Sequence, residues 1–123
     1  MDSRRQKKYA QLLRESMSEI LQREGQSIYG NRALVSITHV KVTPDLSLIR
    51  FYLSIYNDDS KKVFAAIEEH RNHLKHLLGN NMKNHLRKIP VVEFFHDDSM
   101  EQAERINEIF EHLNTEKKRK DND

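Results

Sequence analysis

The sequence predicts one α+β domain in which helices cover one face of a small three-stranded sheet. Three segments have the amphipathic periodicity of helices and three have the pattern of strands. The helical segments are residues 4–24, 60–86 and 100–113, and the strand segments are residues 33–43, 48–56 and 91–96. A chain of 123 residues usually builds a single hydrophobic core. With a kink in the middle segment, the predicted order is α-β-β-α-kink-α-β-α.

The first helix is predicted from apolar side chains that recur every three or four residues and therefore share one face. They are Tyr9, Leu12, Leu13, Met17, Ile20 and Leu21. Gly25 and Gly30 bracket the polar stretch that follows. We therefore expect the helix to end near residue 24 and a loop to precede the first strand.

The first strand changes phase midway. Val35 and Ile37 share one face, whereas two later valines share the other. Because neighbouring side chains of a strand point to opposite faces, the change predicts a β-bulge or a strong twist near Thr38 and His39.

A turn composition at residues 43–46 separates the first two strands, and residues 48–56 then alternate strictly between apolar and polar. The two strands should form an antiparallel hairpin. Residues 58–60, Asp-Asp-Ser, supply acceptors for the free amides at a helix start. Residues 97–99 repeat this device, and Gln102 completes a capping box with Ser99.

The helical segment at residues 60–86 contains no apolar residue from 68 through 73. One straight helix would leave this stretch without a side chain in the core. We expect a break at His70-Arg71-Asn72, because asparagine adopts left-handed backbone angles more readily than most residues. Pro90 prevents a helix from continuing through residue 89.

The composition excludes several classes of protein. The chain has no cysteine, no long apolar stretch and no signal-like amino terminus, so we expect a cytoplasmic protein. Residues 114–123 contain no apolar side chain, and we expect residues 1–113 to form the domain and residues 114–123 a disordered charged tail.

The net charge is only +2, but the charges are sorted along the chain. The basic clusters are Arg4, Arg5, Lys7 and Lys8; Arg71, Lys75, Lys83, Arg87 and Lys88; and residues 117–120. Acidic residues concentrate from residue 93 to residue 111, after the last strand begins. Such a polarised molecule can direct one face to a phosphate backbone. Tyr52 and Tyr56, on the polar face of a strand, are candidate stacking surfaces for bases. The alternative is that the cations are solvated helix faces and that the tyrosines serve packing.

No catalytic or metal-binding motif is present. His70, His73 and His76 lack the i, i+4 spacing of a helical metal pair, and no thiolate accompanies them. Gly25 and Gly30 have the spacing of a phosphate-binding loop but lack the Lys-Ser/Thr that should follow. We therefore expect a binding protein that is not an enzyme and uses no metal, cofactor or small-molecule substrate.

Four segments, in this order, match a known family. They are "ILQRE" (residues 20–24), "VSITHVKVTPDLSLIRFYLSIYN" (residues 35–57), "HLKHLLGNNM" (residues 73–82) and "RKIPVVEFFHDDS" (residues 87–99). On these segments the chain resembles the ribosome-binding factor A family over about residues 4–113.

The resemblance implies a single type II KH-like domain that binds precursor RNA of the small ribosomal subunit on free subunits and supports growth in the cold. It implies no catalysis and no cofactor. The family's kink reads Ala-any-Gly where this chain has His70-Arg71-Asn72, and its Asp-Pro-Arg loop is matched here by Arg32 alone. The expected RNA contacts are Arg4, Arg5, Lys8, Arg32, Arg71, Asn72, Lys75, Lys83, Arg87 and Lys88. We expect a monomer whose partner is the small ribosomal subunit with its precursor RNA, and no membrane.

Two other functions fit the residues less well. The acidic last helix or the edge of the hairpin can recruit a protein partner, which would make the chain an adaptor. The histidines would make it a small metalloenzyme only if the purified protein held a metal ion.

Overall fold

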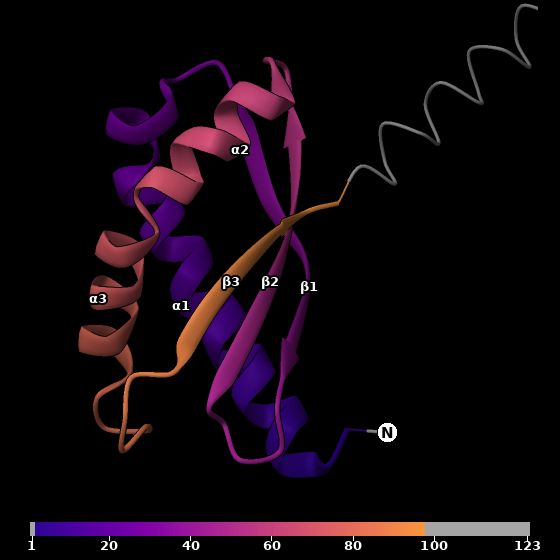
Figure 1. Ribbon diagram of the computed structural model, residues 1–123, viewed down its shortest axis with the longest axis vertical. Coiled ribbons are helices and arrows are strands. Elements are labelled where there is room, and N and C mark those ends of the chain that lie inside the picture. The colour runs from indigo at the N-terminus through magenta and orange to yellow at the C-terminus, as the bar shows by residue number, and fades with distance from the viewer. Residues whose placement is uncertain (1, 98–123) are drawn as a thin grey trace, which may run out of the picture.

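The computed structural model describes residues 2–97 of the chain. These residues form three helices and three strands in the predicted order (Figure 1). The elements are α1 (Arg4–Tyr29), β1 (Leu34–Val42), β2 (Leu48–Tyr56), α2 (Ser60–Glu69), α3 (Arg71–Met82) and β3 (Val91–His96). The bounds of β2 and β3 agree with the sequence prediction. The helix predicted at residues 100–113, the Ser99–Gln102 capping box and the tail lie outside the described residues.

The sheet has the order β1-β2-β3. β1 and β2 form the predicted antiparallel hairpin, and β3 lies parallel to β2. The register shifts between Ile37 and His39, which confirms the predicted β-bulge. The bulge lets Ile37 and Val40 both reach the core although they are an odd number of residues apart.

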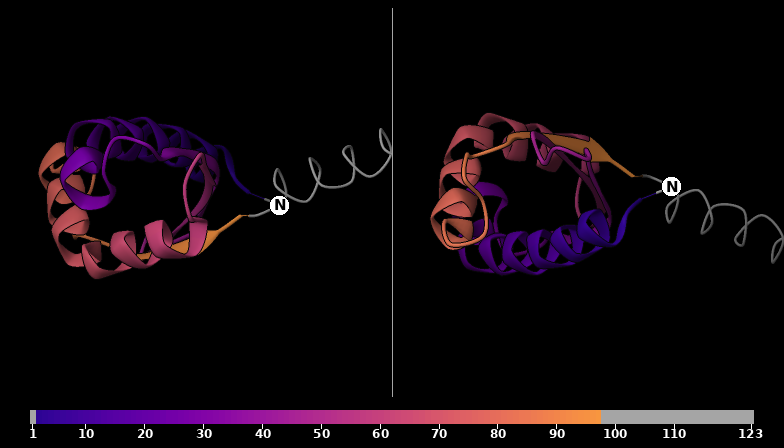
Figure 2. Two further views of the ribbon diagram at one scale, coloured as in Figure 1. Left: turned by 90° about the horizontal axis from the view of Figure 1, so that it is seen from above. Right: turned by 90° about the horizontal axis from the view of Figure 1, so that it is seen from below.

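The three helices cover one face of the sheet, as predicted. Seen along the long axis of the molecule, the helices and the twisted sheet surround one interior, which core side chains fill (Figure 2). Phe51 of β2 and Phe94 of β3 lie at its centre with ring centroids 5.8 Å apart. The opposite face of the sheet carries the polar half of the strand pattern, including Arg50 and Tyr52.

α1 is longer than the sequence predicts, because Gly25 lies inside the helix. The Tyr29 side chain folds back over Gly25 so closely that a Cβ atom there would overlap the Tyr29 Oη. That hydroxyl donates a hydrogen bond to the carbonyl of Leu21 at 3.3 Å, and burial raises the pKa of Tyr29. The prediction of a loop from residue 25 is therefore wrong. The helix ends at Gly30, whose φ of 85° favours glycine.

The predicted break between two helices is confirmed in place but not in cause. α2 and α3 are separated by His70 alone, whose φ of −98° and ψ of 12° are outside the helical range. Asn72 lies within α3 and does not adopt left-handed angles. The His70 ring holds the end of α2 instead, because its Nδ1 atom donates to the carbonyl of Ala66 at 2.8 Å. Asp59 caps the start of α2, as predicted.

Candidate nucleic-acid interface

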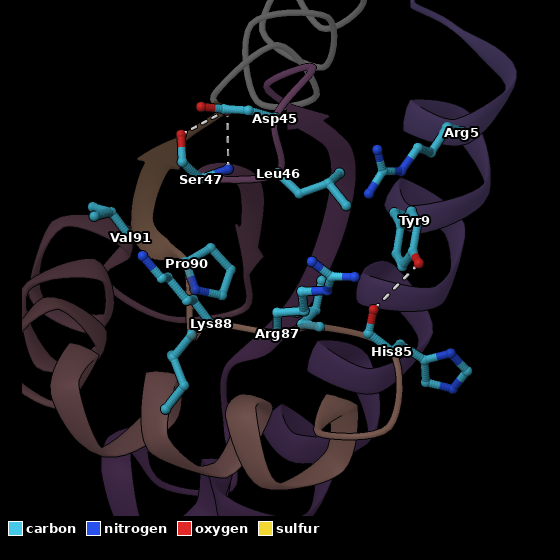
Figure 3. A pocket seen from close by; sticks show the side chains of 12 residues that line it. Arg5, Tyr9, Asp45, Leu46, Ser47, His85, Arg87, Lys88, Pro90 and Val91 are labelled. Atoms are coloured by element: carbon cyan, nitrogen blue, oxygen red, sulfur yellow. Dashed lines mark hydrogen bonds between the residues drawn. The ribbon is translucent and has the colours of Figure 1, made fainter.

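Three segments that are distant in sequence meet at one end of the molecule. They are the start of α1, the turn between β1 and β2, and the loop between α3 and β3 (Figure 1). Between them lies a cleft of about 670 Å³. Its polar lining includes Arg5, Asp45, His85, Arg87 and Lys88, which Figure 3 shows around the opening. We call this surface, together with Arg4 and Lys8 of α1 and Lys83 directly after α3, the cationic end.

The start of α1 is fixed by a capping box that was not predicted from the sequence. The Ser3 hydroxyl accepts from the Gln6 backbone amide at 3.1 Å, and the Gln6 side chain accepts from the Ser3 amide at 2.8 Å. The Gln6 Nε2 atom also donates to the carbonyl of Val42 at 2.8 Å, in a buried bond. Gln6 therefore ties the first turn of α1, with Arg4 and Arg5, to the end of β1.

Tyr9 joins α1 to the loop after α3. Its hydroxyl donates to the carbonyl of His85 at 3.2 Å. The Arg5 guanidinium lies over the Tyr9 ring, 5.8 Å from its centroid, which is within the range of a cation–π contact. The apolar spacing of the sequence assigns Tyr9 only to the core face of the helix. The tyrosine also positions Arg5 beside the loop that carries Arg87.

Gly79 determines how that loop lies on α3. A Cβ atom at residue 79 would lie 2.9 Å from both Cγ1 and Cδ1 of Ile89. The absence of a side chain at Gly79 therefore lets Ile89 approach the helix closely. Arg87 and Lys88 directly precede Ile89, so this packing holds both cations at the cleft.

The carboxylate that lines the same cleft is already engaged by its own turn. Asp45 Oδ1 accepts from the Ser47 hydroxyl at 2.7 Å, from the Thr43 hydroxyl at 2.8 Å and from the Ser47 amide at 3.2 Å. These bonds, with that from the Ser47 hydroxyl the largest, hold the pKa of Asp45 below its usual value. Asp45 thus stays ionised and opposes anions at one rim of the cleft.

Positive charge dominates the rest of the cationic end. Residues 71–88, which form α3 and the loop after it, contain no aspartate or glutamate. Lys83 follows the last residue of α3, and Arg4 and Lys8 are exposed in the first two turns of α1. Cations in the first turn of a helix oppose its dipole and cost stability. A bound anion would remove part of this cost.

α1 and α3 run antiparallel, and three polar contacts join α1 to α3 and to the loop after it. At the far end Glu24 lies 3.9 Å from His73, in the middle Asn81 donates to the Ser16 hydroxyl at 3.3 Å, and at the near end Tyr9 contacts His85. The carboxylates of α1, which begin at Glu15, therefore lie away from the cationic end.

The remaining predicted contacts lie elsewhere. Arg71, Asn72 and Lys75 are at the start of α3, beside the break, where Arg71 pairs with Glu68 at 3.8 Å. Arg32 follows the other end of α1, a helix of 26 residues and so about 39 Å long. The structure thus brings Arg5, Arg87 and Lys88 into one cleft and places Arg32 at the opposite end (Figure 1).

Residues 2–97 hold no group of three or more histidine, aspartate or glutamate side chains arranged to bind a metal ion. None of the helices in this range has the length and apolar character of a transmembrane span.

The helix order, the single-residue break and the three-stranded sheet define the α+β class of type II KH-like domains. A protein-family model described as ribosome-binding factor A matches residues 5–110. The chain belongs to the ribosome-binding factor A family.

Relatives of that name are similar over most of their length. The protein from Cytophaga hutchinsonii is 33% identical over 123 residues, which is 99% of this chain and 92% of the relative. The protein from Chloroherpeton thalassium is 34% identical over 107 residues, covering 81% of this chain and 86% of its own.

Two solved structures share the fold. The crystal structure of ribosome-binding factor A from Thermus thermophilus has a TM-score of 0.59 at 17% identity and covers 71% of this chain and 90% of its own. A homology model of the Thermus thermophilus protein, fitted into a cryo-EM map of its 30S complex, has a TM-score of 0.58 at 19% identity, covering 72% of this chain and 90% of its own.

Proposed function

We propose that the chain is a non-enzymatic factor that binds precursor RNA of the small ribosomal subunit through its cationic end. One observation carries the proposal: the fold gathers Arg5, Arg87 and Lys88 in one cleft, next to a run of residues 71–88 without an acidic side chain. The names of the relatives and the 30S complex of the Thermus protein support the ribosome as the partner.

The chemistry of the cleft suits a phosphate backbone. Arginine presents two parallel N–H groups to phosphate oxygens, and neutralising each phosphate releases condensed counterions. Arg4, Lys8 and Lys83 extend the surface beyond the cleft. Arg71, Asn72 and Lys75 at the helix break, and Arg32 at the far end, belong to the proposed contact as outlying positions, so their individual effects should be smaller.

The proposal includes the cellular role that the family resemblance implies. The factor would act as a cytoplasmic monomer on free subunits during late maturation, without catalysis, and would support growth in the cold. A deletion strain should then grow poorly at low temperature and accumulate unprocessed small-subunit RNA, and the intact gene should restore both.

Sedimentation of the tagged full chain with cell extract tests the binding. The parent should migrate with free small subunits and be absent from translating ribosomes. The Arg87→Ala and Lys88→Ala double variant should shift to the top of the gradient. A matched control is Lys61→Ala with Lys62→Ala, which removes two exposed cations of α2 outside the cationic end.

The adaptor hypothesis makes the opposite prediction. Reversal of Lys83 and Arg87 to glutamate should abolish subunit binding if RNA is the ligand and leave it intact if the chain is an adaptor. Reversal of Glu104 and Glu108 to lysine should abolish binding if the chain is an adaptor and leave it intact if RNA is the ligand. Retention of binding by the first pair and loss in the second would contradict the proposed function.

A further inference from the structure

The sheet face opposite the three described helices carries a row of aromatic rings across all three strands. His39, Tyr52 and Phe95 occupy paired positions of β1, β2 and β3. The ring centroids are 5.7 Å apart between His39 and Tyr52, and 5.3 Å apart between Tyr52 and Phe95. Tyr52 and Phe95 are stacked at 21°. Phe95 remains 39% exposed although it is apolar.

A second row beside the rings is charged. Lys41, Arg50 and Glu93 pair across the same three strands. The Arg50 guanidinium lies 5.9 Å from the centroid of Phe95 and 3.2 Å from the Glu93 carboxylate. Like charges directly opposite on neighbouring strands repel, so the Lys41–Arg50 pair destabilises the sheet. Glu93 offsets this repulsion only in part, because it pairs with Arg50 and not with Lys41. An anion between Lys41 and Arg50 would remove this repulsion.

The aromatic row and Lys41 of the charged row border a shallow depression of about 560 Å³. His39, Lys41, Tyr52 and Phe95 line it, together with His96 and Asp97. Asp97 is held at the edge, where its Oδ2 atom accepts from the Thr38 hydroxyl at 2.6 Å. The depression is therefore lined by aromatic rings, with Lys41 and Asp97 as its charged side chains.

From these contacts we infer that the sheet face opposite the described helices is a second RNA site, which stacks unpaired bases on the His39–Tyr52–Phe95 row. Aromatic rings on an exposed sheet accept the faces of unpaired bases, and an adjacent cation holds the connecting phosphate. A base paired in a helix does not expose its face in this way. The ligand is therefore single-stranded RNA, with Lys41 and Arg50 contacting its backbone.

The site is separate from the cationic end but continuous with it. Val91 of β3 borders the cleft. Phe95 lies four residues further along the same strand, or roughly 13 Å away. The Lys41–Arg50–Glu93 row lies between them in the strand register. A single strand that leaves the cleft can thus cross Arg50 and reach the rings. This inference rests on the proposed function only in that the ligand is RNA.

Fluorescence anisotropy with the full chain tests the site, using a short labelled oligouridylate and an RNA duplex as probes. Phe95→Ala should weaken binding of the oligouridylate about ten-fold, because a stacked base is lost. The affinity of Phe95→Ala for the duplex should equal that of the parent. Phe95→Tyr keeps a ring and should bind like the parent. Leu34→Ala is the matched control, because Leu34 is an apolar side chain of the same sheet that is 61% exposed and lies outside the row.

Three results would overturn the inference. Equal binding of the oligouridylate by Phe95→Ala and the parent would show that no base stacks there. Equal loss in Phe95→Tyr and Phe95→Ala would exclude the ring as the cause. If Phe95→Ala instead lowered the sedimentation coefficient of the purified chain and left RNA binding intact, a second copy of the chain would occupy the face. A parent that bound neither probe would contradict the proposed function itself.

Discussion

At the tip of the hairpin, Asp45 shows how one side chain links the stability of the turn to pH. Its carboxylate accepts from the Ser47 and Thr43 side chains, which lowers its pKa below the usual 3.8. The bonds favour the ionised form in the folded state, so their stabilisation is complete above pH 3.8 and is lost as the pH falls through the lower folded pKa.

Asp45→Ala should therefore lower the melting temperature near neutral pH, and the difference from the parent should shrink as the pH falls below 3.8. Thermal unfolding followed by circular dichroism at several pH values measures this. Asp45→Asn is the control, because it keeps an acceptor oxygen but cannot ionise. A difference between Asp45→Ala and the parent that did not change with pH would show that the charge is irrelevant to the turn.

Among the single elements, α3 depends on Gly79 because the helix must pack closely against Ile89. Replacement of an exposed helical glycine by alanine usually stabilises a helix by about 1 kcal/mol. Here the new Cβ would meet Ile89 at 2.9 Å and displace the loop that carries Arg87 and Lys88.

Gly79→Ala should therefore fail to stabilise the parent, whereas it should stabilise an Ile89→Ala background by about 0.5–1 kcal/mol. Urea unfolding of the four proteins in this double-mutant cycle measures the coupling. Equal stabilisation in both backgrounds would mean that Ile89 does not pack against residue 79.

The break between α2 and α3 gives a second prediction for an element. Because Asn72 has helical backbone angles and is exposed, Asn72→Ala should keep the break and raise the free energy of unfolding by about 0.5 kcal/mol. Urea denaturation measures this change, and amide exchange of residues 69–73 shows whether the break persists. If Asn72→Ala instead lowered the free energy of unfolding by more than about 1 kcal/mol, the sequence-based explanation that asparagine holds the break would be supported.

For the whole molecule, the decisive property is the grouping of cations at one end. If four to six phosphates are neutralised there, a log–log plot of affinity for a small-subunit RNA fragment against salt should have a slope of roughly −3 to −5. Arg87→Ala should reduce the magnitude of the slope by about 1. A flat titration would contradict electrostatic binding.

Phe95→Ala, in contrast, should leave this slope nearly unchanged, because stacking releases few counterions. The two surfaces are thus distinguished by the same titration. A fall in slope for Phe95→Ala equal to that for Arg87→Ala would indicate one shared electrostatic site.

Sequence patterns correctly predict the order of the described elements, the bounds of β2 and β3, the bulge near His39 and the place of the helix break. Each depends on the spacing of apolar residues or on neighbouring residues, which is local information. Tertiary packing, which these patterns do not contain, pairs β3 with β2 and brings Arg5 to the cleft that Arg87 lines. Tyr9 and His85, which join these segments, are 76 residues apart, and the close packing of Ile89 on Gly79 depends on the third dimension. Local patterns specify which face of an element is buried, but contacts between distant segments form only when those faces pack together.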